Sequence, residues 1–331
     1  MAKFPDRRLR RLRYHPTLRA MLAGVRLSVL DLVAPLFVRS GQGTRGVISS
    51  MPGQFQFSPD LALETVLGWS SSGLRAVLLF GIPDSKDPSG SSAWDDDGPV
   101  QTLTRLIKTK APEVLVITDV CLCEYTDHGH CGVLSRCGER VEIDNDATLP
   151  LLAKAALSQA RAGADLVAPS AMMDGQVATI RHVLDAAGLV ETGILSYAVK
   201  FASSFYGPFR DAAGSHPQSG DRRSHQADFA NPRGNICEAL ADIDEGADIL
   251  MVKPALPYLD VIASLRRRTD LPIAAYHVSG EYASIQAAAR AGWLEERAAA
   301  IEVTTAIKRA GADLIITYFA GQLSGWLAEG A

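Results

Sequence analysis

The sequence predicts an α/β protein with a (β/α)₈ barrel, the TIM-barrel fold. Short apolar strands alternate with helices along the whole chain, and eight such strands can be counted. The strands are apolar on both faces, which is typical of a parallel sheet covered by helices. The tripeptide Gly-Ala-Asp recurs at Gly163, Gly246 and Gly311, each time two or three residues before a strand. Eight such units favour a closed barrel; a doubly wound open sheet is the alternative, which the lack of GxGxxG after the first strand disfavours.

The chain repeats a unit made of a helix, a glycine or proline, a short apolar strand and a polar loop. We expect the strands at residues 32–38, 76–80, 114–118, 166–168, 194–199, 249–252, 273–276 and 314–317. The first helix of the barrel begins at Ser58-Pro59, with proline in the first helical position, and ends at Gly73. Further helices are expected at 100–110, 149–162 and 258–268. Another is capped by Asp174 and ends near Gly188, one ends at Glu245, and a last pair ends at Gly311.

Composition and charge place the chain among ordinary globular proteins. Of its 331 residues, 47% are hydrophobic and 21% are charged, and the net charge is −4. This charge implies neither a nucleic-acid partner nor a membrane partner. No apolar run reaches the roughly 18 residues of a spanning helix, and the N-terminus has no apolar core of a secretory signal. We therefore expect a cytoplasmic protein whose five cysteines are thiols or metal ligands rather than disulfides.

Residues 1–26 differ from the rest of the chain. They carry seven arginines and Lys3 against one acidic residue, Asp6, and apolar side chains interleave with these charges. A solvated basic tail and a transit peptide are the alternatives. The interleaving favours an arm that packs on another subunit, so we divide the chain into an oligomerisation arm (1–26) and a single catalytic barrel (27–331).

Polar residues stand at the carboxyl ends of six predicted strands, where barrel enzymes place their chemistry. They are Asp119, Ser170, Lys200, Lys253, His277 with Ser279, and Tyr318. Two lysines end consecutive strands, and adjacent strands lie about 4.8 Å apart. Each amine is expected to lower the pKa of the other, because like charges repel and burial disfavours a cation. A neutral amine is what Schiff-base chemistry with a ketone needs; the alternative is that each amine reaches solvent or a carboxylate.

The loop after the third strand contains three cysteines with the spacing C-x-C-x₇-C, at Cys121, Cys123 and Cys131. Three thiolates leave one position free on a zinc ion, as in catalytic zinc sites. The cysteines are otherwise inert buried thiols. A third possibility is that His128 or His130 replaces one ligand or adds a fourth, which would give a closed structural site.

About thirty-five residues with little periodicity follow Lys200, at positions 201–235. A loop of this length inside a compact fold is usually a lid or disordered. It carries Arg210, Arg222 and Gln226 among aromatic residues. We expect a lid whose arginines hold a carboxylate through paired hydrogen bonds; a mobile solvated loop is the alternative.

Six segments, in this order, resemble the porphobilinogen synthase (5-aminolevulinate dehydratase) family over nearly the whole chain. They are DVCLCEYTDHGHCG, APSAMMDG, YAVKFASSFYGPFRDA, MVKPALPYLD, YHVSGEYA and RAGADLI. The resemblance implies a lyase with an α/β barrel and an N-terminal arm, usually in homo-octamers. It would condense two 5-aminolevulinate molecules to porphobilinogen in tetrapyrrole biosynthesis.

The resemblance also implies a role for each candidate residue. Lys253 matches the Schiff-base lysine of the family and Lys200 its second active-site lysine. The substrate-binding positions are Arg210, Arg222 and Gln226 in the lid, with Asp119, Ser279 and Tyr318 in the barrel. The three cysteines match the zinc ligands of the zinc-dependent branch, and Glu238 matches an allosteric magnesium ligand of some members.

Two other classes of protein remain open from the sequence alone. One is a different Schiff-base barrel enzyme, such as an aldolase acting on phosphorylated sugars, which would need no loop with three thiols. The other is an inactive barrel kept as a metal-binding or scaffold protein, against which the presence of both lysines argues.

Overall fold

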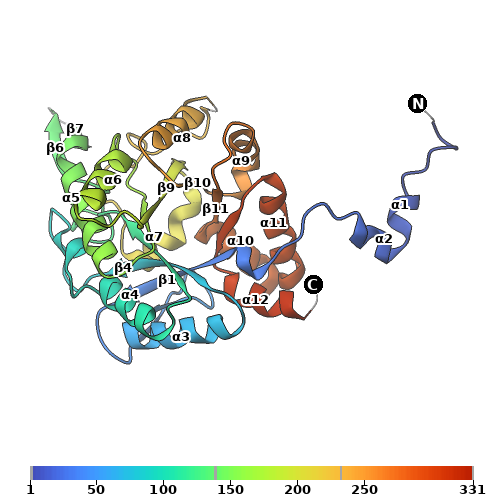
Figure 1. Cartoon of the computed structure of the whole chain (residues 1–331), viewed down its shortest axis with the longest axis horizontal. Helices are drawn as coiled ribbons and strands as arrows, with labels where there is room; N and C mark the ends of the chain where they lie inside the picture. Colours follow the sequence, from blue (N-terminus) through green and yellow to red (C-terminus); the bar gives the residue numbers. More distant parts are fainter. Residues whose placement is uncertain (1–2, 138–139, 232, 330–331) are drawn as a thin grey trace.

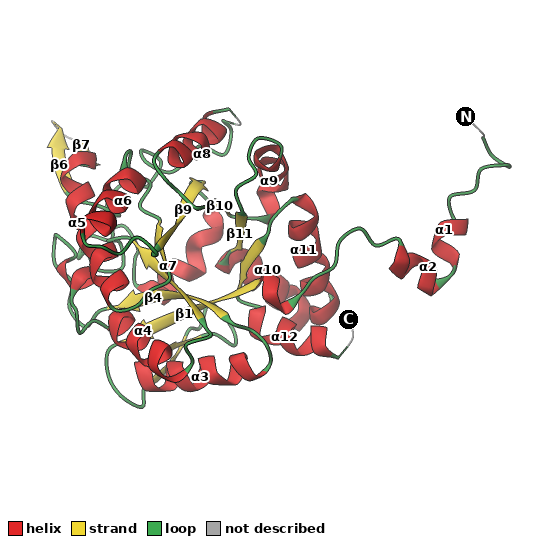
Figure 2. Cartoon of the chain, viewed as in Figure 1, coloured by secondary structure: helices red, strands yellow, loops and turns green. Residues whose placement is uncertain are grey.

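The computed structural model describes residues 3–137, 140–231 and 233–329. Residues 1–2 of the predicted arm, Pro232 of the predicted lid and residues 138–139 and 330–331 of the predicted barrel domain lie outside this part. The predicted barrel is confirmed: the strands stand at the centre and the helices surround them (Figure 2). The barrel strands are β1 (Leu32–Arg39), β4 (Ala76–Ile82), β5 (Leu115–Val120), β8 (Leu166–Pro169), β9 (Gly193–Lys200), β10 (Ile249–Lys253), β11 (Ile273–His277) and β12 (Leu314–Thr317).

All neighbouring barrel strands run parallel, and β12 pairs back onto β1, which closes the sheet. The interior of the barrel is filled by apolar side chains such as Phe37, Phe80 and Tyr276, each at most 1% exposed. Because the strands are parallel, their carboxyl ends meet at one mouth of the barrel. The predicted strands lie within two residues of the observed bounds, since each apolar run is buried over nearly its whole length.

Helices cover the outside of the barrel, most of them where the sequence predicts them. They are α3 (Pro59–Ser71), α4 (Pro99–Lys110), α5 (Asn145–Arg161), α6 (Gln176–Ala186), α8 (Gly234–Asp244), α9 (Leu259–Arg266), α10 (Ser279–Arg290), α11 (Glu296–Ala310) and α12 (Ala320–Ala328). No helix in the described part of the chain is long and apolar enough to cross a membrane.

The three Gly-Ala-Asp repeats have a shared structural role. Each glycine has a positive φ, between 103° and 121°, as the predicted helix ends require. Each aspartate then accepts a hydrogen bond from a backbone N–H at the start of the preceding strand in the sheet. The pairs are Asp165 with Val116 (2.7 Å), Asp248 with Ile194 (2.7 Å) and Asp313 with Ile273 (2.8 Å). The repeat therefore sets the register between adjacent strands at the amino-terminal end of the barrel.

Two predicted helix starts are wrong. Asp174 does not cap α6, because Gly175 in the left-handed region precedes its first residue, and the Asp174 N–H donates to Asn145. The helix predicted from residue 149 begins at Asn145 instead, and Asp144 caps it by accepting from the N–H of Ala147 at 3.0 Å. Pro150 therefore lies inside this helix and does not mark its start.

Several short elements are not predicted, because each has too few residues to show a period. They are α1 (Arg11–Tyr14) and α2 (Pro16–Met21) in the arm, β2 (Arg45–Val47) and β3 (Phe55–Phe57) beside β1, β6 (Leu134–Cys137) and β7 (Arg140–Ile143) after the cysteine loop, α7 (Gly207–Ala213) in the predicted lid, and single 3₁₀ turns at Val29–Asp31, Ser91–Trp94, Ser204–Tyr206 and Leu256–Tyr258. The last barrel helix, α12, is likewise not predicted from the sequence.

The N-terminal segment leads away from the barrel, with α1 and α2 standing apart from it (Figure 1). Its apolar side chains face solvent: Phe4 is 76% exposed, Tyr14 88% and Met21 72%. Large apolar side chains are seldom left exposed together unless they meet a partner. This geometry is that of an arm, whose role is taken up below.

Candidate active site

Lys200 and Lys253 end adjacent strands and stand opposite each other in the register of β9 and β10. Both side chains are only 5% exposed. The chain buries them because each ends an apolar strand whose preceding residues fill the barrel. The sequence prediction that the two amines share the mouth of the barrel is therefore confirmed in its geometry, and the alternative that each reaches solvent is wrong.

The amine of Lys253 lies among aromatic rings. Its Nζ is 4.4 Å from the ring centroid of Tyr276, 5.0 Å from Tyr197 and 5.1 Å from Phe209. Tyr206 and Phe80 are at 5.4 Å and 6.0 Å. This burial, together with the nearby positive charge of Lys200, lowers the pKa of Lys253 from 10.5 to about 7. About half of the amine is then neutral at pH 7.

Lys200 has a different environment. Its Nζ donates to the carbonyl of Ser170 at 2.5 Å, and the Ser170 hydroxyl donates to Asp119 at 3.1 Å. Burial would lower the pKa of the Lys200 amine, but the thiolate of Cys131 and its neighbouring negative groups outweigh burial and raise it. The prediction that each lysine lowers the pKa of the other is therefore right for Lys253 and wrong for Lys200, because the cysteine loop lies against Lys200.

Two buried carboxyl groups complete the floor of the site. Burial and the charge of Glu124 raise the pKa of Asp119 to about 7, and burial also raises the pKa of Glu124 to about 8. Each can therefore hold or release a proton near neutral pH. Asp119 is predicted from its place at the end of a strand. Glu124 is missed, although its place between Cys123 and Tyr125 in the cysteine loop is a signal that could have found it.

The three cysteines come together as predicted. Their sulfur atoms all lie within 4.8 Å of one another, and Cys121 Sγ is 3.4 Å from Cys123 Sγ. All three are buried. Hydrogen bonds with Cys121 and Cys123 lower the pKa of the Cys131 thiol. Hydrogen bonds with Cys123 and Cys131 raise the pKa of the Cys121 thiol. A cluster of this kind can hold a metal ion in place of the shared protons.

Neither histidine of the cysteine loop belongs to this cluster. His128 Nε2 is 3.2 Å from the carbonyl of Pro88, and its Nδ1 accepts from the backbone N–H of His130. His130 Nε2 lies 2.8 Å from the carbonyl of Ser219 in the segment after Lys200. Among the described residues, only the three cysteines form a group of metal-ligand geometry. The protein therefore offers a metal ion three sulfur ligands and not the four ligands of a closed structural site.

The segment after Lys200 lies over the barrel mouth and contacts the cysteine loop. The backbone N–H of Gln218 donates to the carbonyl of His128 at 3.1 Å, and the Gln218 side chain donates to the carbonyl of Asp127 at 2.6 Å. Arg222, only 5% exposed, donates from Nη2 to the carbonyls of Gly129 and Ser215 at 2.8 Å and 2.7 Å. Parts of the segment are thus held against the site by hydrogen bonds, while other parts, such as residues 218–221 and 228–231, are exposed to solvent.

Two of the three predicted lid residues line the same space as the two lysines. Arg210 and Arg222 line the same small space as Lys200, Lys253 and Asp119, and the volume of this space is about 10 Å³. Such a volume holds one water molecule at most. A substrate with a carboxylate and a ketone does not fit this space as it stands, although the same two arginines also line a neighbouring pocket of about 410 Å³.

Gln226 is 3% exposed, and neither polar atom of its amide has a hydrogen-bond partner among the described residues. The Nε atoms of Arg210 and Arg222 are likewise buried without a partner in this part of the chain. Buried polar atoms are nearly always paired, so unpaired ones around one site indicate a missing polar ligand. All three predicted lid residues are in this state, as are Asp119 Oδ1 and the Tyr197 hydroxyl.

Ser279 and Tyr318 lie on the other side of the mouth. The Ser279 hydroxyl accepts from the backbone N–H of Phe209 at 3.0 Å and donates to the carbonyl of Phe205 at 3.3 Å, both in the covering segment. The Tyr318 hydroxyl accepts from Tyr276 at 3.0 Å. Ser279 is therefore hydrogen-bonded to the segment that covers the site. Tyr318 is hydrogen-bonded to Tyr276, whose ring lies beside the amine of Lys253.

Glu238 has surroundings unlike those of the lysines and cysteines. It is on α8, where burial and the charges of Asp174 and Glu245 raise its pKa. Within the described residues it belongs to no group whose ligand atoms come close enough for a metal ion. The structure therefore does not bring the predicted magnesium ligand into a formed site.

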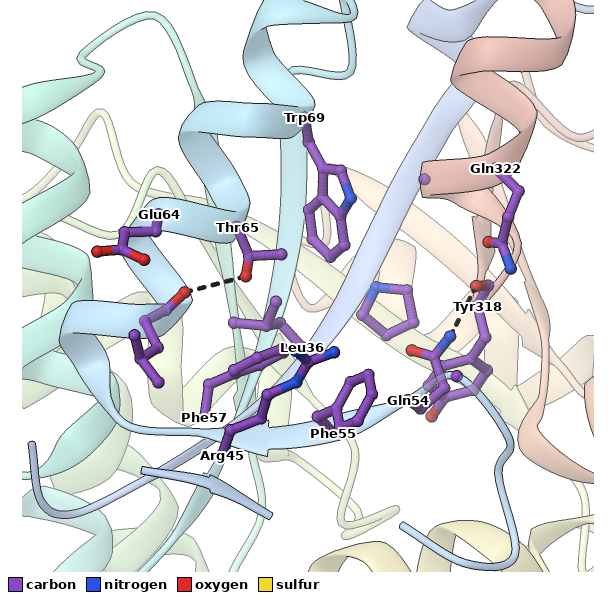
Figure 3. A pocket seen from close by; sticks show the side chains of 14 residues that line it. Leu36, Arg45, Gln54, Phe55, Phe57, Glu64, Thr65, Trp69, Tyr318 and Gln322 are labelled. Atoms are coloured by element: carbon purple, nitrogen blue, oxygen red, sulfur yellow. Dashed lines mark hydrogen bonds between the residues drawn. The ribbon is translucent and has the colours of Figure 1, made fainter. Parts of the chain in front are cut away.

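A larger cavity, of about 570 Å³, lies between α3, β2, β3 and the start of α12 (Figure 3). Arg45 stacks over the ring of Phe55 at 3.6 Å, and the Gln54 amide donates to the Tyr318 carbonyl at 3.1 Å. Among the described residues that line this cavity there is no lysine and no cysteine. The smaller site at the barrel mouth therefore remains the candidate for chemistry.

Known proteins resemble this chain over nearly its whole length. The family model for delta-aminolevulinic acid dehydratase matches residues 6–326. Relatives with that name include proteins of Synechococcus elongatus (50% identical; 98% of this chain and 100% of that protein) and Archaeoglobus fulgidus (52%; 98% and 99%). A solved structure of the Toxoplasma gondii enzyme in complex with the product porphobilinogen has a TM-score of 0.95 at 43% identity, covering 98% of this chain and 92% of that one.

Proposed function

The chain belongs to the delta-aminolevulinic acid dehydratase family, and from this premise we propose how its own residues carry out the reaction. The function is that of a porphobilinogen synthase, a hydro-lyase of tetrapyrrole biosynthesis. Two molecules of 5-aminolevulinate condense to one porphobilinogen with loss of two waters. The observation that carries the assignment of roles is the pair of buried lysines in register at the barrel mouth.

Lys253 is the residue that forms the imine in this proposal. Its pKa of about 7 leaves a neutral amine available to attack the ketone carbon of one substrate. The carbon–oxygen bond then breaks and water leaves. The aromatic rings around Nζ exclude bulk water from the resulting imine, which would otherwise hydrolyse.

Lys200 and Asp119 supply charge and proton transfer beside Lys253. Lys200 is held by the carbonyl of Ser170, and its raised pKa keeps it cationic at neutral pH. Asp119, with a pKa of about 7, can accept a proton from carbon or deliver one to a leaving oxygen. We propose that Asp119 also contacts the substrate.

The three thiols fit zinc better than magnesium. Thiolate sulfur is a soft ligand suited to zinc, whereas magnesium prefers oxygen. Cys121, Cys123 and Cys131 would hold the zinc ion and leave one position for a non-protein ligand. When bound, zinc supplies a positive charge and Lewis acidity close to the second substrate.

Five further side chains bind the two substrates in the proposal. Ser279 with Tyr318 holds the carboxylate of the substrate that forms the imine with Lys253, and Arg210 and Arg222, with Gln226, hold the other substrate from the lid at residues 201–235. The unpaired polar atoms of the lid residues and the small volume of the site support this assignment. Closure of the lid over bound substrate would pair those atoms.

The lid proposal predicts a large effect of Arg210→Ala. Removing one partner of a buried carboxylate costs about 2–5 kcal/mol of binding, so kcat/KM for 5-aminolevulinate falls steeply, mainly through KM. Arg222→Ala has a similar effect on KM and in addition loosens the cysteine loop, because Arg222 also binds the carbonyl of Gly129. Steady-state kinetics of porphobilinogen formation measures both.

Arg223→Ala is the matched control for the lid. Arg223 follows Arg222 directly, but its side chain is exposed and pairs with the exposed Asp221. Its kinetics should stay close to those of the unaltered enzyme. An unchanged kcat/KM in Arg210→Ala would refute the carboxylate clamp.

We further propose that residues 1–26 embrace a second copy of the chain and that the assembly is a homo-octamer. The exposed apolar side chains of the arm and its position away from the barrel support this (Figure 1). Deleting residues 1–26 should give smaller assemblies in sedimentation velocity, while the barrel stays folded by circular dichroism. An intact chain that sediments as a monomer would defeat the assembly proposal.

Magnesium at Glu238 and a cytoplasmic location also remain proposals. Asp174 and Glu245 lie near enough to raise the pKa of Glu238, and the three carboxylates would have to close in around an ion to offer the oxygen ligands that magnesium prefers. Such a site would be an allosteric one, and magnesium would change the activity of the unaltered enzyme but not that of Glu238→Gln. Cell fractionation tests the location.

A further inference from the structure

Glu281 is a buried carboxylate outside the groups assigned above. It lies in the first turn of α10 and is 3% exposed. Burial raises its pKa to about 7, although backbone N–H groups that donate to it oppose the rise. A carboxylate in so dry a place is costly unless it is fully hydrogen-bonded, so its partners need explaining.

The two oxygens of Glu281 bind two different loops of the barrel mouth. Oε1 accepts from the backbone N–H of Leu256 at 2.6 Å, three residues after Lys253. Oε2 accepts from the backbone N–H of Val278 at 2.5 Å, one residue before Ser279. One carboxylate therefore joins the loop that follows the imine-forming lysine to the loop that carries a carboxylate-binding hydroxyl.

The same two loops are also linked through Phe209, in the segment that folds over the barrel mouth after Lys200. Ser279 accepts from the backbone N–H of Phe209, and the ring of Phe209 lies 5.1 Å from the amine of Lys253. The loop after Lys253 and the loop that carries Ser279 are thus linked twice, once through the carboxylate of Glu281 and once through Phe209. A shift of the Val278 loop relative to the Leu256 loop would change the distance from the amine to the Ser279 hydroxyl.

We propose that Glu281 is a positioning residue, which sets the spacing between Lys253 and Ser279 and thereby fits the site to a ketone that carries a carboxylate at a fixed distance. The inference rests on the proposed roles of those two residues. Glu281 itself touches no substrate. It acts by holding two backbone segments at once, which a helix cap confined to its own helix would not do.

Glu281→Gln tests this with little change of shape. The amide keeps one oxygen, but its NH₂ group then faces a backbone N–H, and one of the two bonds is lost. Such a loss in a buried place leaves a donor unsatisfied and loosens one loop. If the glutamine variant did not fold, Glu281→Asp, which keeps the charge with a shorter reach, would serve in the same comparison.

The readout compares two ketones, levulinate and 2-pentanone, in which a carboxylate and a methyl group occupy the same position. Each can form an imine but lacks the amino group needed for condensation. Each is incubated with the full chain and cyanoborohydride, and labelling of Lys253 is followed by peptide mass spectrometry over a range of ketone concentrations. We expect the preference for levulinate over 2-pentanone to fall about tenfold in Glu281→Gln, with labelling by 2-pentanone nearly unchanged.

Ile285→Ala is the control for a merely structural effect. Ile285 lies one turn further along α10 and is 7% exposed, so its truncation loosens the same helix while the bonds of Glu281 to Leu256 and Val278 stay in place. It should leave the preference between the two ketones as it is. An unaltered preference in Glu281→Gln would overturn the inference. If neither ketone labels Lys253 in the unaltered chain, the proposed imine role of Lys253 fails instead.

Discussion

Lys253→Arg is expected to abolish porphobilinogen formation, with a loss on the order of 10⁴-fold or more. Arginine keeps a positive charge at this position, but its guanidinium stays protonated in proteins and forms no imine with a ketone. The loss would therefore separate covalent chemistry from charge. The rate of porphobilinogen formation, followed by a pyrrole colour reaction, measures it.

Lys253→Met is the companion variant that excludes unfolding as the cause. Methionine fills a similar volume among the aromatic rings and removes the cost of burying an amine. Because burial lowers the pKa of Lys253 from 10.5 to about 7, the unaltered chain loses stability as the pH falls from about 10 to 7. The methionine variant should lack that loss and be at least as stable at pH 7. An active arginine or methionine variant would contradict the role of Lys253.

Removal of the metal should have the second-largest effect. We expect chelation, or Cys123→Ser, to abolish activity while the barrel remains folded, because the three ligands come from one loop after β5 and not from the strands. Circular dichroism and thermal unfolding, measured beside activity, separate the two effects. Elemental analysis should find one zinc ion per active site in active protein.

Two outcomes would contradict the zinc proposal in different ways. Active protein without zinc would exclude it altogether. Loss of the fold together with activity in Cys123→Ser would make the metal structural. Cys237→Ser is the matched control, since Cys237 is exposed on α8 and lies outside the cluster, so its activity and zinc content should not change.

The barrel and the strand ends could be predicted because they depend on local patterns. Apolar runs that end in Lys200 and Lys253 need only be buried as parallel strands for the two amines to meet. The spacing of the cysteines likewise brings three sulfurs together within a single loop. The two lysines occupy equivalent positions in consecutive repeats, and the three cysteines are close in sequence. Such relationships are visible in the sequence, and they determine where these side chains lie.

The rest of the site depends on contacts between distant segments. The rise in the pKa of Lys200 comes from the cysteine loop, which follows a different strand and packs against this amine, and it reverses the predicted direction. The aromatic surroundings of Lys253 include Tyr206 and Phe209, which arrive only when the segment after Lys200 folds back over the barrel. Glu281 gives no sign in the sequence beyond a helix start, because its second partner, Leu256, is on the loop of another strand.

The proposed mechanism depends above all on which lysine forms the imine and on the pH at which it does so. 5-Aminolevulinate is added with cyanoborohydride over a pH series, and the reduced adduct is located by peptide mass spectrometry. We predict an adduct on Lys253 whose initial rate is half-maximal near pH 7 and falls at lower pH, because the amine is protonated below its pKa of about 7. An adduct only on other lysines, or labelling of Lys253 that begins only above about pH 9, as an unperturbed amine would require, would contradict it.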